Sequence, residues 1–372
     1  MKKNIRRTLS FVMVLVMLVI MAVPAFAASS PFQKSAYTTI ITASDFQAKG
    51  ESAYDRFEKI ITLMKKDGLT DPSAALIGGD YSKTYPDNAT PGVKIIKEKY
   101  TKVYPKESAD SVICIQGNHD FVSAGFTKSG FYDMDTFCLY VINENDFCWN
   151  QFVRTPVTIK ATANKVEKAL NEMIENKDYR PVIILTHVPL HHSGRSSGGD
   201  NMYSSYLFDV INKAAEKLDI VFLFGHNHSG AYDDYIGGSV NFLKPSDTIR
   251  IPKAGKISSD DYTEETLNFT YTNSGYVGYS NNGTENGSTN ILTAGAIQIS
   301  KNKIRFVKYS EKGLYKTYDV QRKNKCTDRS SSTDMPEIQS EYIWDILVNL
   351  LEFIKENTGV TVLPMFDNIK AA

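Results

Sequence analysis

Five short runs of apolar and β-branched residues constrain the fold of this chain more than any other feature. They are YTTIITAS (37–44), AALIGG (74–79), SVICIQG (111–117), RPVIILT (180–186) and DIVFLFG (219–225). Their apolar residues are continuous rather than alternating, which is typical of strands buried on both faces. The pattern therefore predicts a layered α/β or ββ sandwich.

Helical segments separate several of these runs. Apolar residues recur at helical spacing in 53–68, 161–177 and 202–218. This β-α-β alternation predicts ligand sites at the points where strands end.

The chain changes character in its last third. Residues 273–290 are rich in Gly, Ser, Thr and Asn, which favours a long loop or flap. Residues 291–320 alternate with period two and are broken near Asn302 and Gly313, which predicts an antiparallel meander that closes the sheet.

The two ends of the sequence differ in composition from the part between them. Residues 1–27 have a basic start, an apolar stretch from Phe11 to Val23 and an Ala25-Phe26-Ala27 cleavage pattern, as in a secretory signal peptide. An uncleaved membrane anchor is the alternative, but this stretch falls short of the ~20 residues that a spanning helix needs. We therefore expect a secreted or cell-envelope protein with no transmembrane anchor after cleavage. One domain over 28–322 is expected, followed by a linker and an amphipathic helix within 323–372.

Charge and cysteine usage exclude some partners. The chain has 42 basic and 42 acidic residues. Because the signal segment is basic, the mature chain is slightly acidic, so there is no nucleic-acid-binding footprint. Cys114 is expected to be a buried thiol, and Cys326 has no evident partner. Cys138 and Cys148 either form a cross-strand disulfide or remain two unpaired core cysteines.

Each of the five runs ends in residues that can bind a metal ion. In order, they are Ser44-Asp45-Phe46-Gln47, Gly78-Gly79-Asp80, Gly117-Asn118-His119-Asp120, Thr186-His187 and Gly225-His226-Asn227-His228. A single His after a strand is more often structural than a ligand, but five strand ends of this kind are hard to ascribe to packing. The glycines let the backbone turn sharply and bring the side chains together. Mixed imidazole and carboxylate ligands suit Mn, Fe or Zn rather than Ca.

The ordered set D-x-[H/Q], G-D, G-N-H-D, H and G-H-x-H resembles the calcineurin-like metallophosphoesterase superfamily over roughly residues 37–320. The resemblance implies a four-layer α/β/β/α sandwich with mixed sheets and two metal ions at the strand ends. The implied ligands of the first ion are Asp45, Gln47, Asp80 and His228. Those of the second are the bridging Asp80 with Asn118, His187 and His226.

The function implied is metal-dependent hydrolysis of phosphomonoesters or phosphodiesters, either small molecules or polymers. Two cations ~3.5–4 Å apart neutralise phosphoryl oxygens and lower the pKa of a bridging water, whose hydroxide attacks phosphorus. His119 resembles the acid or transition-state stabiliser of the family. Asp120 either orients His119 or caps the turn. The alternative is a non-catalytic extracellular binding protein that holds metal on the same fold.

Two positions depart from common family patterns. Gln47 stands where many members have His, and its amide oxygen is a weaker ligand. The same substitution resembles the manganese-dependent ADP-ribose/CDP-alcohol diphosphatases, which favours a nucleotide-type diphosphate substrate. Tyr81-Ser82-Lys83 follows Asp80 without the tyrosine of purple acid phosphatases or the Asp-Arg-Gly of protein Ser/Thr phosphatases, which argues against both.

Two further groups are candidates for substrate contact. His191, His192 and Arg195 follow His187 and are expected to be exposed and to grip phosphate, unless they form an ordinary polar loop. Tyr271, Tyr276 and Tyr279 either stack on a base or sugar or, more in keeping with their surroundings, pack in a β-loop.

Overall fold

The computed structural model describes ten ranges of the 372-residue chain. They are 30–32, 36–47, 52–82, 87–123, 125–147, 156–191, 202–228, 242–256, 261–278 and 292–324. The predictions for residues 1–27, Cys148, Cys326 and the C-terminal helix lie outside these ranges.

The first sheet has seven strands. Its path runs β17-β16-β15-β1-β2-β4, and β14 pairs with β15 off that path. Strands β1, β2 and β4 are mutually parallel. Strand β15 is antiparallel to β1, β14 and β16, and β16 is antiparallel to β17. The bounds are β1 Thr38–Ala43, β2 Ala74–Ile77, β4 Val112–Cys114, β14 Gly275–Tyr276, β15 Thr293–Ile299, β16 Lys303–Ser310 and β17 Gly313–Gln321.

The second sheet has six strands in the order β10-β13-β9-β8-β7-β6. Strands β13, β9, β8 and β7 are parallel, and the two edge strands are antiparallel to their neighbours. The bounds are β6 Gly130–Asp133, β7 Cys138–Ile142, β8 Val182–Thr186, β9 Ile220–Phe224, β10 Phe242–Leu243 and β13 Thr270–Asn273. All five strands predicted from the apolar runs are confirmed.

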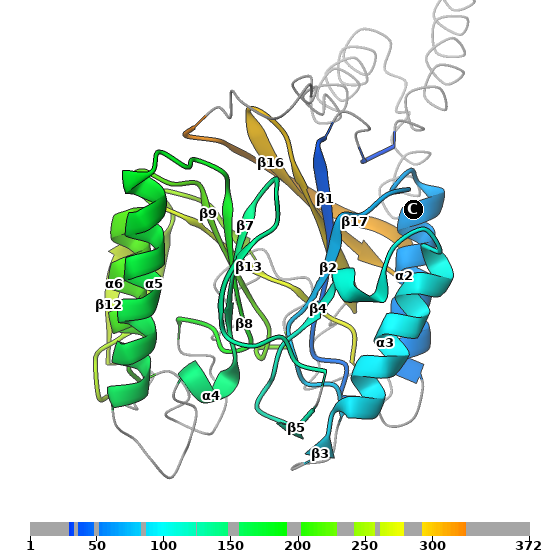
Figure 1. The fold of residues 1–372 in the computed structure, drawn as a ribbon, viewed down its shortest axis with the longest axis horizontal. Coiled ribbons are helices and arrows are strands. Elements are labelled where there is room, and N and C mark those ends of the chain that lie inside the picture. The colour runs from blue at the N-terminus through cyan, green and yellow to red at the C-terminus, as the bar shows by residue number, and fades with distance from the viewer. Residues whose placement is uncertain are drawn as a thin grey trace, which may run out of the picture. The chain divides into compact units, whose positions relative to one another are not determined.

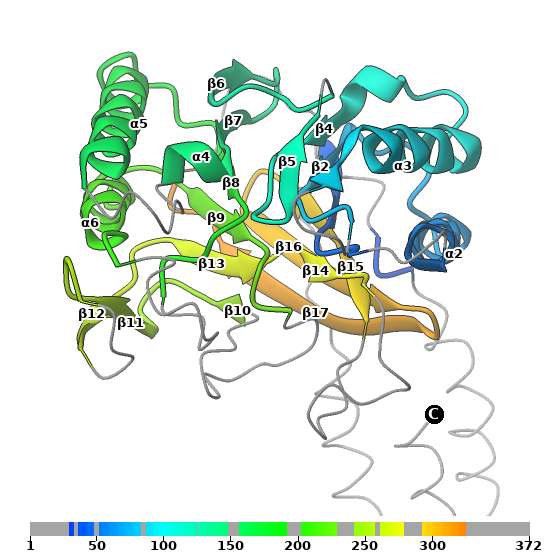
Figure 2. The ribbon, with the colours of Figure 1, turned by 90° about the horizontal axis from the view of Figure 1, so that it is seen from below.

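Helices cover the outer face of each sheet. Helices α2 and α3 pack on the first sheet, and α5 and α6 pack on the second, so the described domain has four layers (Figures 1 and 2). The helices are α2 Ser52–Lys66, α3 Thr90–Val103, α4 Glu144–Phe147, α5 Val157–Glu175 and α6 Ser205–Ala214, with a 3₁₀ turn at Ala109–Ser111. None of the described helices is both long and apolar enough to cross a bilayer.

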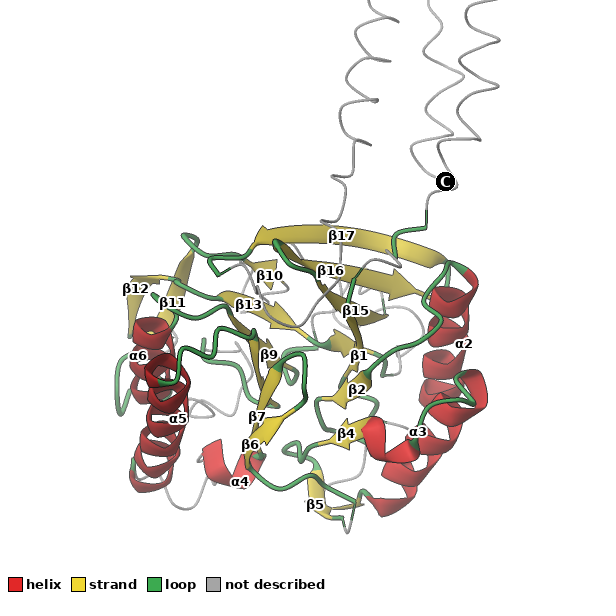
Figure 3. Ribbon diagram, turned by 45° about the horizontal axis from the view of Figure 1, so that its top comes forward, coloured by secondary structure: helices red, strands yellow, loops and turns green. Residues whose placement is uncertain are grey.

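The two sheets bury a third apolar core between them (Figure 3). In β2, Leu76 points into this core while Ile77 points to the helices, and both side chains are fully buried. A strand with apolar contacts on both faces needs an unbroken apolar run. The predicted four-layer α/β/β/α sandwich with mixed sheets is therefore confirmed.

The last third of the chain follows the predicted meander but corrects the predicted loop. Strands β15, β16 and β17 form the meander, with turns at 301–302 and 311–312, close to the predicted breaks near Asn302 and Gly313. The expectation of a loop from 273 is wrong at its start, because β14 pairs there with β15. Two small sheets complete the described chain. They are β3 Asp87–Asn88 with β5 Asp120–Val122, and β11 Thr248–Pro252 with β12 Tyr262–Thr266.

The cysteine predictions are resolved in part. Cys114 and Cys138 are buried free thiols, so the expectation of a buried Cys114 is confirmed. The cross-strand disulfide between Cys138 and Cys148 is not supported, because helix α4 rather than a second strand follows β7. The chain remains hydrogen-bonded to the domain as far as Asn324, whose backbone N–H donates to Asp219 Oδ2 (3.3 Å). The domain boundary at 322 stays a prediction.

Candidate metal centre

The five predicted strand ends meet at one edge of the sandwich. Strands β1, β2 and β4 deliver their loops from the first sheet, and β8 and β9 deliver theirs from the second. Five of the predicted ligands have a positive φ, a conformation that costs free energy in a non-glycine residue and that clusters at functional sites. They are Asp45 (54°), Gln47 (41°), Asp80 (58°), His226 (67°) and His228 (51°).

Backbone hydrogen bonds fix these loops to one another. The N–H of Asp45 donates to Gly79 O (3.0 Å), and the N–H of Gln47 donates to Asp80 O (2.8 Å). Across the two sheets, the N–H of His226 donates to the carboxylate of Asp45 at 2.9 and 3.1 Å. The backbone is thus bent sharply and held by its neighbours, which sustains the unusual φ angles.

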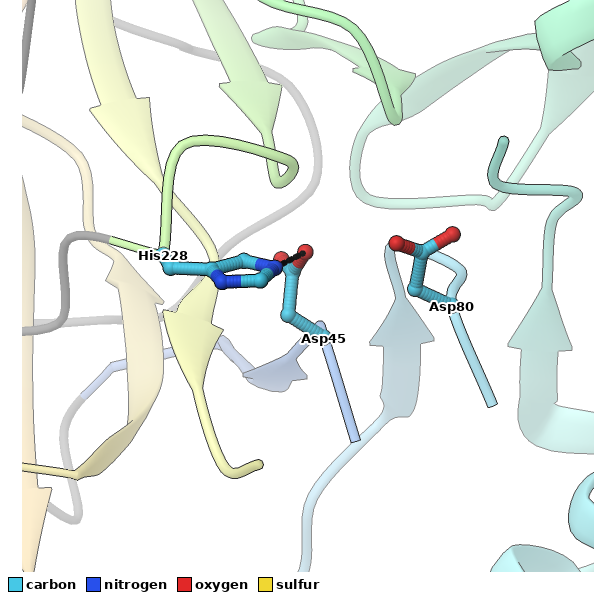
Figure 4. A group of neighbouring side chains, drawn as sticks. All are labelled: Asp45, Asp80 and His228. Carbon is cyan, nitrogen blue, oxygen red and sulfur yellow. Dashed lines mark ion pairs between the residues drawn. The ribbon is translucent and has the colours of Figure 1, made fainter. Parts of the chain in front are cut away.

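Asp45, Asp80 and His228 form the first group of donors. One ligand atom from each lies within 4.8 Å of the other two, and all three side chains are buried. His228 Nε2 lies 3.3 Å from Asp45 Oδ1. Figure 4 shows this imidazole facing Asp45, whose carboxylate lies between His228 and Asp80 in that view. Gln47 Nε2 lies 3.2 Å from Asp80 Oδ2, so a half-turn of the amide would bring its oxygen into the same group.

Asn118, His187 and His226 form the second group. The Oδ1 atom of Asn118 lies 3.0 Å from His187 Nε2 and 2.9 Å from His226 Nδ1. Asp80 Oδ1 lies 3.4 Å from His187 Nε2. Ligand atoms ~2.1 Å from one ion lie about 3.0–3.4 Å apart. The contacts of the second group are close to this spacing. In the first group the His228–Asp45 pair matches it, while the three donors together lie within 4.8 Å of one another. Asp80 belongs to both groups, as a bridging carboxylate must.

Glycines make this close approach possible. A Cβ atom on Gly225 would lie 2.1 Å from Ser44 Oγ and 2.7 Å from Asp45 Oδ2. A Cβ atom on Gly117 would lie 2.3 Å from Asp80 Oδ1. The expectation that glycines bring the site residues close together is confirmed at these two positions.

The protonation of His187 depends on the carboxylates beside it. Burial lowers the pKa of His187, but the carboxylates of Asp80 and Asp45 outweigh this and raise that pKa to about 10. Nδ1 of His187 lies 2.7 Å from Gly78 O, so it donates its proton there and turns Nε2 toward Asn118. Because a metal ligand must present a lone pair, binding an ion at Nε2 releases a proton, and metal affinity should fall in acid.

His119 and Asp120 lie directly beside the second group. The N–H of His119 donates to Asp80 Oδ1 (2.9 Å), and the side chain of His119 is partly exposed. Asp120 Oδ2 accepts the N–H groups of Asp80 (2.7 Å) and Gly117 (2.8 Å), and Oδ1 accepts that of Tyr81 (3.0 Å). Of the two roles considered for Asp120, these contacts are those of a carboxylate that caps and braces the loops.

The expected exposure of His191 is wrong. Its side chain is fully buried, its ring packs edge-on against Phe224 and Tyr271, and its Nδ1 lies 2.7 Å from Tyr271 Oη. Tyr271 comes from β13, so this contact packs the loop after β8 against the second sheet. His192, Arg195 and Tyr279 lie outside the described residues, and their roles stay predictions.

Tyr276 packs inside the protein, as the packing alternative predicted, and its partner is one of the predicted ligands. Its ring is buried and lies flat on the imidazole of His228, with centroids 4.6 Å apart and planes 4° apart. The next residue, Val277, donates its N–H to Ser44 O (3.1 Å). Strand β14 therefore packs against His228 through Tyr276, and the residue after it is tied to the loop that carries Asp45.

Asn143 was also missed. Its Oδ1 accepts the N–H of Gln116 (2.8 Å), and its Nδ2 donates to Thr127 O (2.9 Å). It thereby ties the loop that carries Asn118 to the end of β7 in the other sheet. The run CLYVI before Asn143 is a sixth apolar strand that ends in polar residues, which was the available signal.

The chain was compared with proteins of known structure and with curated proteins. Among solved structures, the chain is similar to a dimetal phosphatase from Danio rerio (11% identity, 77% of this chain and 99% of that chain covered, TM-score 0.46). It is also similar to GAP50, the anchor in the inner membrane complex of Plasmodium (12%, 80% and 91%, 0.44), and to a predicted phosphoesterase from Streptococcus pneumoniae (12%, 77% and 98%, 0.36). These likenesses are too distant to transfer a function. No curated protein matches the sequence.

The family model is more specific. The model described as calcineurin-like phosphoesterase matches residues 38–230, just over half of the chain, and contains all five strand ends described above. With the four-layer sandwich and the two donor groups at its edge, this match shows that the chain belongs to the calcineurin-like phosphoesterase family.

Proposed function

We propose that this protein is an exported phosphoesterase that hydrolyses phosphomonoesters or phosphodiesters with two metal ions of the Mn, Fe or Zn type. The observation that carries the proposal is the pair of donor groups that share Asp80. Export rests on the signal-like sequence of residues 1–27.

The donor set fits two ions. Asp45, Gln47, Asp80 and His228 would hold the first ion, and Asp80, Asn118, His187 and His226 would hold the second. When bound, two such ions neutralise phosphate oxygens and lower the pKa of water to near neutrality. Imidazole and carboxylate donors in this mixture select transition metals over Ca²⁺.

The chain's own residues supply the rest. His119 is the one imidazole in the Gly117–Asp120 loop, and its backbone is fixed through Asp80 Oδ1. Its side chain is not among the atoms that converge in the two donor groups, and it is partly exposed. We assign it to protonate the leaving oxygen of the ester, or to stabilise the charge that develops there. Asp120 keeps the loop of His119 in place through its three backbone contacts.

The first experiment uses the chain from Ala28 onward. Metal content is measured by elemental analysis, and p-nitrophenyl phosphate and bis-p-nitrophenyl phosphate are assayed with added Mn²⁺ in the same preparation. We expect about two ions per chain and turnover, and the preferred ester distinguishes a monoesterase from a diesterase. One ion or none, without turnover on any metal, would instead favour a non-catalytic binding protein. The mass of the protein recovered outside the cell, beginning at Ala28, tests export.

Two substitutions test the assigned roles. His119→Ala should keep both ions and the fold but lose at least ~100-fold in rate. Full activity of this variant would remove His119 from the mechanism. Asp80→Asn should lose both metal and activity, because an amide cannot bridge two cations as a carboxylate does. Retention of two ions by Asp80→Asn would refute the bridging assignment.

A further inference from the structure

A sixth strand ends at the metal-centre edge. Strand β7 is parallel to β8, and Ile142 lies opposite Thr186. The residues that follow Ile142 are therefore neighbours of His187, which follows Thr186. They are Asn143, which ties the Asn118 loop to β7, and Glu144, which begins helix α4 (Figure 1).

Glu144 is a buried acid whose hydrogen bonding is incomplete. The residue is 5% exposed, and its Oε1 atom is buried without a hydrogen-bond partner in the described part of the chain. Buried polar atoms in native proteins are nearly always paired, so an unpaired carboxylate oxygen implies a donor or a cation that belongs beside it. The Oε1 atom of Glu144 is thus an acceptor without a donor among its described neighbours.

The electrostatic neighbours of Glu144 lie in or beside the second donor group. After burial, which is the largest cause, the groups that act on its pKa are His187, which lowers it, and Asp80 and Asp120, which raise it. The net effect raises the pKa of Glu144 to about 8. A cation among these residues would act in the opposite direction and favour the carboxylate.

We propose that Glu144 is an outer acidic group of the second metal position, where its carboxylate balances the charge of the ion held by Asn118, His187 and His226. This inference rests on the proposed function. Glu144 is a positioning residue rather than a ligand in this assignment. Asn143 fixes the Asn118 loop to the same strand end, so one short segment both places a ligand and supplies the compensating charge.

The test compares Glu144→Gln, which has the same shape without the charge, with Glu175→Gln, an exposed glutamate on α5 as the control. Mn²⁺ binding is measured by calorimetry on the whole mature protein, and Tm is measured with and without Mn²⁺. Loss of an outer group of a metal site costs about 10–100-fold in affinity. We expect one of the two Mn²⁺ ions to bind at least ~10-fold more weakly to Glu144→Gln, with the other unchanged. The metal-free Tm should be equal to or higher than that of the parent protein, and Glu144→Asp should recover part of the affinity.

Two results would overturn the inference. One is Mn²⁺ binding by Glu144→Gln equal to that of the parent protein and of Glu175→Gln. The other is a fall in Tm of the same size with and without Mn²⁺, which would give Glu144 a packing role. Both differ from failure of the proposed function itself, in which the parent protein binds fewer than two ions or hydrolyses no phosphate ester.

Discussion

At the scale of single residues, this protein concentrates unfavourable conformations at the metal centre. Eight non-glycine residues among those described have a positive φ, and five of them are predicted ligands. Such conformations persist only where the surroundings over-determine them. Here the surroundings are the backbone bonds between the loops, such as those from Asp45 to Gly79 and from Gln47 to Asp80. The strain is the structural cost of turning the chain sharply at the ends of β1, β2 and β9.

Lys308 is a second costly residue. It lies in β16 on the same face as Ile304 and Phe306, which belong to the core between the sheets, and it is 3% exposed. Its Nζ atom donates to the carbonyl of Asn273. Burial lowers the pKa of Lys308 to about 7. A lysine of the unfolded chain has a pKa of ~10.4, so between pH 7 and 10 the unfolded state binds more protons and stability rises with pH.

Lys308→Met should therefore be more stable than the parent protein by an amount that depends on pH. The advantage should be largest near pH 7 and should shrink by about 1 kcal/mol per pH unit toward pH 10. Urea unfolding of both proteins at one fixed metal concentration measures it. Lys66→Met, at an exposed lysine of α2, is the control and should run parallel to the parent. Parallel curves for Lys308→Met as well would show that Lys308 stays protonated in the folded state.

At the scale of elements, the sequence predicts where strands end better than it predicts the surroundings of the residues that follow them. A continuous apolar run followed by Gly, Asp, Asn or His is a local signal, and all five such runs become strands that end at the site. Burial of His191 depends on Tyr271, eighty positions away, which no local pattern reveals. Glu144 was missed for another reason, since Asn143 to Asp146 resemble a turn between two strands but form the start of helix α4.

The prediction at this scale concerns Gly225, where the loops after β1 and β9 lie close together. Gly225→Ala would place a methyl group 2.1 Å from Ser44 Oγ, so the loops after β1 and β9 must separate. We expect a stability loss of about 1–3 kcal/mol, as for an overpacked core, and weaker Mn²⁺ binding. Ser44 Oγ is buried without a hydrogen-bond partner in the described chain, so Ser44→Ala alone should cost little.

The double variant provides the matched control. Gly225→Ala with Ser44→Ala should recover part of the lost stability, because the nearest clashing atom is gone, although Asp45 Oδ2 remains 2.7 Å from the new methyl group. The coupling is read from a double-mutant cycle of urea unfolding. Strict additivity of the two substitutions would mean that the loops do not meet at Ser44.

At the scale of the whole described domain, the metal centre joins the two sheets. The first sheet contributes the carboxylate and amide ligands from the ends of β1, β2 and β4, and the second contributes all three imidazoles from the ends of β8 and β9. Direct links already cross this edge, such as the bonds from His226 N–H to Asp45 and from Gln116 N–H to Asn143. An ion bound by residues of both sheets would add further cross-links at the same edge.

Metal removal should loosen this edge and leave the outer layers intact. A ligand that binds only the folded state raises its stability, by ~2.7 kcal/mol at one hundred times its Kd. We expect chelation to lower Tm and to speed hydrogen exchange at the amides of Gln116 and His226, while the amides of helix α5 keep their protection. Helix α5 packs on the outer face of the second sheet and provides no ligand, so it is an internal control. Exchange that accelerates equally in α5 and in both loops would mean that the ions stabilise the fold as one unit. Exchange unchanged everywhere would mean that the edge is held by the protein alone.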